Sequence, residues 1–148
     1  MCFLLYAGTG KAIARSRWQR EAPGIYVQSL IEYDVAIQAH FSRPEVQQIG
    51  STSGCGCDFP HVMYQNGGWP SSPDAETDEE QLASDRFNRA SLVALLQTTG
   101  EAIVELYGVW AGDFTEEPRV RQEISLASIR REDFHFNERC FYRVFLNG

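Results

Sequence analysis

The chain lacks the features that mark several common classes of protein. None of its 148 residues belongs to an apolar run that approaches the roughly 20 residues needed to cross a membrane. The short apolar stretch MCFLLYAG has no basic segment before it and no small-residue cleavage site after it. We therefore interpret it as a first β-strand and not as a signal peptide, and we expect no membrane partner.

Basic residues are also scarce. Lysine and arginine number 13 against 20 acidic residues, which gives a formal net charge of −7. Because neutralising a phosphate backbone needs a basic surface, this balance argues against a nucleic-acid partner. The segment KAIARSRWQR departs from the trend, since it places four basic residues around Trp18. We interpret it as a solvated connection between strands, with an anion-binding patch as the alternative.

Cysteines are few, and their spacing argues against disulfides. The four are Cys2, Cys55, Cys57 and Cys140. A bridge between Cys55 and Cys57 would close a very small, strained ring, and no export signal accompanies them. We therefore expect a cytoplasmic protein whose thiols are free or bound to metal.

The pattern of apolar residues predicts one globular domain over residues 1–148. We predict strands over 2–7, 25–31, 45–50, 102–110 and 136–146, and a short helix over 32–43 with Tyr33, Ile37 and Phe41 on one face. Segment 123–129 begins as a strand and turns into a helix capped by Ser125. Glycine, proline and acidic residues predict a long surface loop at about 65–78.

The clearest element is a helix over 77–100. Thr77 and Glu80 form a capping box and Gly100 provides the stop. Its apolar face is expected to carry Leu82, Phe87, Ala90 and Ala94. The order of elements predicts an α+β fold: a mainly antiparallel sheet with two principal helices packed on one face.

The stretch GSTSGCGCDFPH, residues 50–61, carries most of the chemical information. Cys55 and Cys57 can turn toward one centre if Gly56 adopts a backbone angle that other residues avoid. Thiolates are soft, charged donors, so zinc or an iron–sulfur cluster is the expected cofactor. A structural site normally needs four ligands, and the predicted metal site is Cys55, Cys57, His61 and Cys140. Cys2 is an alternative ligand, and Asp58 is a poorer one.

The segment CGCDF resembles the C-G-C-G-x-S-F motif of A-type iron–sulfur carrier proteins, in which a third cysteine lies well upstream. Cys2 would take that third place here. Asp58 stands where the carriers have glycine, and 91 residues follow Cys57 whereas the carriers end near this motif. The resemblance therefore implies only that C-G-C is a known way of presenting two thiolates to iron.

Three interpretations of this stretch follow from its residues. The thiols are inert packing groups, or they bind metal, or one of them reacts. For the last, Cys55 or Cys57 would pair with His61 as a general base, in a thiol-dependent enzyme or a redox protein. Our prediction is a small acidic binding module with a thiolate metal site, whose partner is a protein or a small molecule.

Overall fold

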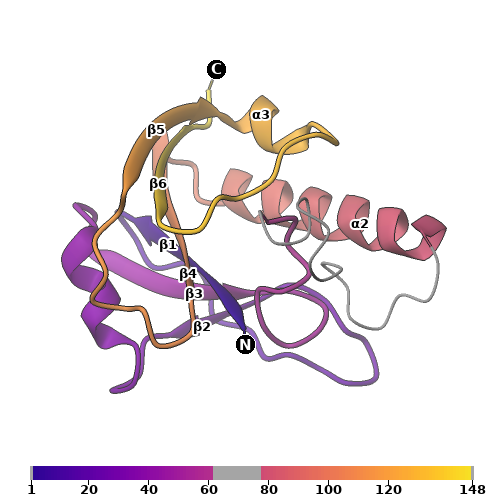
Figure 1. The fold of residues 1–148 in the computed structure, drawn as a ribbon, viewed down its shortest axis with the longest axis horizontal. Helices are drawn as coiled ribbons and strands as arrows, with labels where there is room; N and C mark the ends of the chain where they lie inside the picture. The colour runs from indigo at the N-terminus through magenta and orange to yellow at the C-terminus, as the bar shows by residue number, and fades with distance from the viewer. Residues whose placement is uncertain (1, 62–77, 148) are drawn as a thin grey trace.

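The computed structural model describes residues 2–61 and 78–147 (Figure 1). Within these ranges, six strands form one mixed sheet in the order β2-β3-β1-β4-β6-β5. The fold belongs to the α+β class, as predicted. Most of the predicted loop at 65–78 lies outside the described residues, as does the capping residue Thr77. The elements are β1 (Phe3–Thr9), β2 (Tyr26–Ser29), η1 (Val35–His40), β3 (Glu45–Gly50), α2 (Asp78–Gln97), β4 (Ile103–Trp110), β5 (Val120–Ser125), α3 (Leu126–Arg130) and β6 (Cys140–Phe145).

Strand β1 lies inside the sheet and is buried along its whole length. Phe3 and Leu5 point into a hydrophobic cluster on one face of the sheet, and Leu4 and Tyr6 point into a second cluster on the other face. A strand that is covered on both faces is apolar at successive positions and does not alternate with polar residues. This explains the sequence FLLYAGT.

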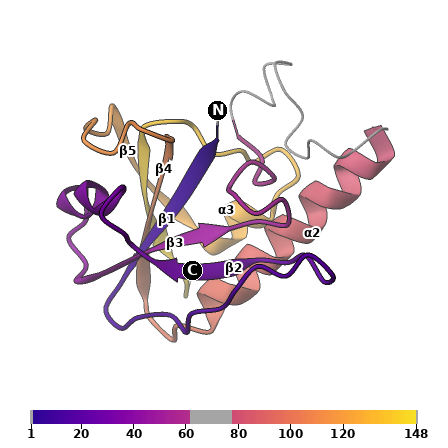
Figure 2. The ribbon, with the colours of Figure 1, turned by 90° about the horizontal axis from the view of Figure 1, so that it is seen from below.

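The two faces of the sheet carry different helices, as Figures 1 and 2 show. Leu92 and Leu96 of α2 belong to the cluster that contains Phe3, whereas Ile37 of η1 belongs to the cluster that contains Tyr6. The helix predicted over 32–43 is thus a six-residue 3₁₀ helix on the face opposite α2. The prediction that the two principal helices pack on one face is therefore not confirmed: β1 is apolar on both sides, so both sides need a cover, and η1 covers the side opposite α2.

One end of the sheet departs from the antiparallel pattern. Among the strand pairs in the described ranges, β5 and β6 run parallel and the others run antiparallel. After β5 the chain enters α3 and then returns to the end of the sheet at which β5 began, where β6 starts. This is the crossover that a parallel pair requires.

Helix α2 buries polar residues in its first half. Leu82 and Phe87 are exposed, at 40% and 53%, although the sequence pattern placed them on the apolar face. The buried side chains there are polar, and Gln81 donates a hydrogen bond of 3.0 Å to Asp85. The apolar contact with the sheet begins only at Leu92. In the described ranges no helix is both long and apolar enough to cross a membrane.

Candidate metal centre

The register of β1 and β3 brings the cysteine loop to the start of the chain. The two strands are antiparallel neighbours, with Leu5 opposite Ile49. The end of β3 therefore lies beside the beginning of β1, and the loop that follows Gly50 starts next to Cys2. The Cys2 backbone is fixed in turn, because its carbonyl accepts a hydrogen bond of 2.8 Å from the Ala111 N–H.

Gly56 seats the loop directly on the backbone of β1. Its N–H donates a hydrogen bond of 3.0 Å to the Phe3 carbonyl. A Cβ atom at this position would lie 2.6 Å from that same oxygen, so any other residue type would force the loop away from β1. The sequence predicted an unusual backbone angle at Gly56, but the glycine of this loop with positive φ is Gly54, at 85°. The glycine between the cysteines is required for close approach.

Asp58 closes the loop from inside. Its carboxylate accepts hydrogen bonds from the Thr52 hydroxyl at 2.7 Å, the Ser51 hydroxyl at 3.2 Å and the Ser53 N–H. The side chain is 1% exposed, and in the described ranges its Oδ1 has no hydrogen-bond partner. This poorer candidate ligand of the sequence analysis is thus mainly an organiser of the turn that carries Cys55.

Asn88 holds the same turn from helix α2. Its Oδ1 accepts a hydrogen bond of 3.2 Å from the Thr52 N–H, and its Nδ2 donates one of 3.1 Å to the Thr52 hydroxyl. Asn88 is fully buried. Asn88 was not predicted from the sequence; the available signal was a set of polar residues, at 81, 85 and 88, spaced three or four apart along a helix.

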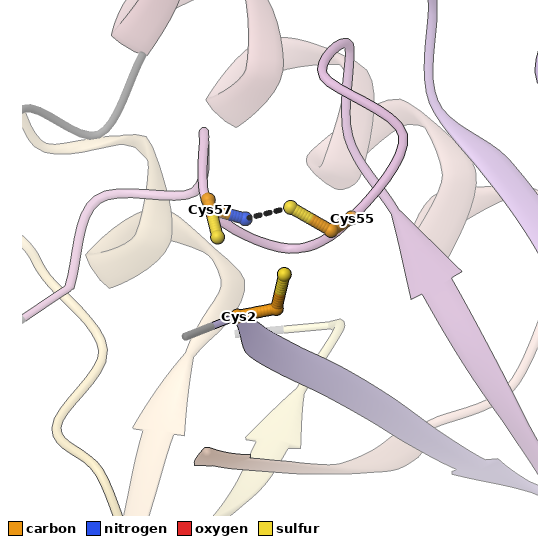
Figure 3. Close-up of side chains that lie close together, drawn as sticks. All are labelled: Cys2, Cys55 and Cys57. Carbon is orange, nitrogen blue, oxygen red and sulfur yellow. Dashed lines mark hydrogen bonds between the residues drawn. The ribbon is translucent and has the colours of Figure 1, made fainter. Parts of the chain in front are cut away.

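Three thiols converge between the loop and the start of β1 (Figure 3). The sulfur atoms of Cys2, Cys55 and Cys57 all lie within 4.8 Å of one another. Cys2 is exposed, whereas Cys55 and Cys57 are half-buried. Zn–S bonds of about 2.3 Å in a tetrahedral site set sulfurs about 3.8 Å apart, so a shift of about 1 Å or less would bring the three to one ion.

Hydrogen bonds set different protonation states for the two loop thiols. The pKa of Cys55 is lowered to about 6, chiefly by a hydrogen bond from the Cys57 side chain and also by the Ser53 hydroxyl and the Cys57 N–H, against the opposing effect of burial. The N–H contact to the Cys55 sulfur measures 3.4 Å (Figure 3). The same side-chain hydrogen bond, with burial, raises the pKa of Cys57. In the metal-free protein Cys55 is therefore the thiolate and Cys57 its donor.

His61 lies in the core beside this centre and not among its three sulfurs. It is 3% exposed, its ring stacks on Phe3 at 4.9 Å between centroids, and Trp110 meets it edge-on. Burial lowers its pKa to about 4, against a raising hydrogen bond to the backbone of Cys57. His61 therefore supports the end of the loop as a neutral ring. In the described ranges its Nδ1 has no hydrogen-bond partner.

Cys140 is separated from the other thiols by its place in the core. It is 2% exposed in the hydrophobic cluster beneath α2, and burial raises the pKa of its thiol. The structure thus brings together Cys55 and Cys57 from the predicted set and replaces His61 and Cys140 with Cys2. The sequence offered Cys2 as an alternative ligand, and the pairing of β1 with β3 is what brings its sulfur to Cys55 and Cys57.

Comparison with known protein families, with curated proteins and with solved structures finds no match to this chain. The resemblance to A-type iron–sulfur carriers stays confined to the few residues that carry it. The chemistry of the centre is therefore argued from its own atoms.

Proposed function

We propose that this protein is a thiolate metal-binding module that holds a single soft cation, zinc in the first instance, between Cys2, Cys55 and Cys57. The observation that carries the proposal is the convergence of three sulfur atoms within 4.8 Å, from two segments more than 50 residues apart. Sulfur donors select zinc or another soft ion over magnesium and calcium, which prefer oxygen.

The compactness of the group favours one ion over a cluster. An iron–sulfur cluster binds its thiolates through different iron atoms, so its ligands are spread around a larger body. Three sulfurs this close suit the bond lengths of a mononuclear site. The described residues supply three ligands, and Cys2 is on the exposed side. A fourth position open to water or to a partner's ligand is typical of sites that exchange ligands and not of closed structural sites.

Metal content tests this proposal directly. The protein is purified without chelator, and its zinc, iron and copper are measured by inductively coupled plasma mass spectrometry beside the Cys55→Ser/Cys57→Ser variant. We expect near-stoichiometric metal that the variant loses. Cobalt substitution adds a second readout, since thiolate-to-cobalt charge-transfer bands report the number of sulfur ligands. Sub-stoichiometric metal in the wild-type protein, with no uptake after reconstitution, would refute the proposal.

The exposure of Cys2 favours a second function, reversible thiol oxidation. With a hydroperoxide as oxidant, two thiols lose two protons and two electrons to form a disulfide, and the hydroperoxide is reduced to an alcohol and water. Cys2 is the partner that the geometry offers to Cys55 or Cys57. His61 is a poor base for this chemistry because burial lowers its pKa to about 4, so the ring has little affinity for a proton. Peptide mapping without reductant after peroxide treatment would detect a bridge to Cys2, and its absence would exclude this function.

A further inference from the structure

A groove of about 700 Å³ runs along the edge strand β2. This strand is the neighbour of β3, from which the cysteine loop leaves the sheet. Its lining comes from the segment that precedes β2, from β2 itself and from Gly54 of the cysteine loop. The lining residues are Arg15, Ser16, Arg17, Trp18, Tyr26, Val27, Gln28, Ser29 and Gly54.

The outer wall of this groove is held in place by hydrogen bonds to the sheet. Ser16 donates its N–H to the Val27 carbonyl at 3.0 Å and accepts the Val27 N–H on its hydroxyl at 3.2 Å. Two residues before Arg15, the buried Gln47 side chain bonds both the N–H and the carbonyl of Ile13. Arg15 and Arg17 therefore extend from a backbone that is fixed on both sides.

The groove is positively charged in a protein whose net charge is −7. Two arginines line it, and the described lining residues include no aspartate or glutamate. Arg15 contacts the Ser29 hydroxyl at 3.4 Å, and within the described ranges neither Arg15 nor Arg17 has an ion-pair partner. Two guanidinium groups that make no ion pair within the described residues favour an anion, which they can bind through paired N–H donors.

An oriented aromatic ring joins the groove to the thiol centre. Trp18 donates its indole N–H to the Thr52 carbonyl at 2.9 Å, and its ring covers Gly54 while 39% of the residue stays exposed. The Tyr26 hydroxyl donates to the Gly54 carbonyl at 2.6 Å. The ring is thus fixed by the loop that carries Cys55, and it offers a surface on which a planar group can stack.

We propose that this groove is a binding site for a small anion that carries a planar ring, with its phosphate or carboxylate on Arg15 and Arg17 and its ring against Trp18. Such a ligand would lie beside Gly54, next to the cysteine loop. The site is independent of metal, because none of its lining residues is a proposed metal ligand.

Titration of the isotope-labelled, metal-free protein by NMR spectroscopy tests this site, with adenosine monophosphate as the first probe. We expect saturable shifts of the backbone signals of the groove. Adenosine should bind at least tenfold more weakly, since it lacks the charge, and inorganic phosphate at least tenfold more weakly, since it lacks the ring. Benzoate tests whether the anionic group is a phosphate or a carboxylate. If benzoate gives saturable shifts and adenosine monophosphate does not, the ligand carries a carboxylate.

Substitution separates a built site from general attraction to a cation. The Arg15→Gln/Arg17→Gln variant should weaken binding of adenosine monophosphate at least tenfold, whereas Arg119→Gln, an exposed arginine before the opposite edge strand β5, should leave it unchanged. The absence of saturable shifts with both anionic ring probes, or equal weakening by both arginine changes, would overturn the proposal. Because binding is measured without metal and metal content without ligand, each proposal can fail while the other stands.

Discussion

The N–H of Gly56 donates a hydrogen bond of 3.0 Å to the carbonyl oxygen of Phe3, and a Cβ atom on Gly56 would lie 2.6 Å from that oxygen. The next peptide continues the contact, because the Phe3 N–H donates to the Cys57 sulfur at 3.4 Å. The backbone of the cysteine loop thus packs directly against the backbone of β1. This contact determines which cysteines meet.

Replacing Gly56 with alanine should separate the loop from β1. The new methyl group meets backbone and not a flexible side chain, so we expect a loss of about 1–3 kcal/mol in the free energy of unfolding. Metal binding should fall with it, because Cys2 and Cys57 are held by the same contact. Gly24→Ala is the matched control, since its Cβ would meet nothing within 4 Å. Denaturant unfolding and metal content measure both effects; equal behaviour of the two variants would contradict the role of Gly56.

Two cysteine variants separate the ligand set of the structure from the one predicted by sequence. Cys2→Ser should lower zinc affinity by roughly tenfold or more, since it removes a direct ligand. Cys140→Ala should leave zinc affinity unchanged and cost only stability, because Cys140 packs in the core. Competition with a chromogenic chelator measures both. The reverse pattern would restore Cys140 to the site.

The reactivity of Cys55 in the metal-free protein should follow its lowered pKa. Only the thiolate reacts with iodoacetamide, so the labelling rate should rise through a midpoint near pH 6, instead of near the ordinary value of 9.0. The largest cause is the Cys57 side chain, so Cys57→Ala should move the midpoint upward. Site-resolved mass spectrometry reads each cysteine separately. A wild-type rate that is still rising steeply between pH 8 and pH 9 would show that Cys55 is an ordinary thiol.

His61 should make the protein less stable in acid. Its pKa falls from 6.5 to about 4 on folding, so the unfolded chain takes up the proton first. The stabilisation is fully present above about pH 6.5 and is lost as the pH falls toward 4, with up to about 3 kcal/mol at stake. We expect His61→Gln to show a shallower loss of unfolding free energy over this window. Parallel slopes in chemical denaturation from pH 7 to pH 4 would contradict the assignment.

The local elements could be predicted from the sequence because their signals are local. Apolar and aromatic residues bounded by glycine or proline predicted the strands near 3–9, 45–50 and 103–110, and the capping box and the Gly100 stop predicted the helix that α2 forms. The pattern failed at Leu82 and Phe87 because the polar side chains of the same turns find partners elsewhere in the fold. A polar residue that is satisfied by tertiary contacts cannot be distinguished, in sequence, from one that faces water.

The sequence by itself determined that Cys55 and Cys57 lie in a tight, glycine-rich loop, because this conclusion depends only on the spacing of the cysteines and the small size of their neighbours. The third member of the group was decided by tertiary structure. The sequence predicted His61 and Cys140 as partners and offered Cys2 as an alternative. In the structure, the antiparallel register of Leu5 with Ile49 places Cys2 beside the loop, while β6 buries Cys140 in the core. Strand order and register depend on how whole faces of the sheet are covered, and that is a property of the folded chain, which no single segment contains.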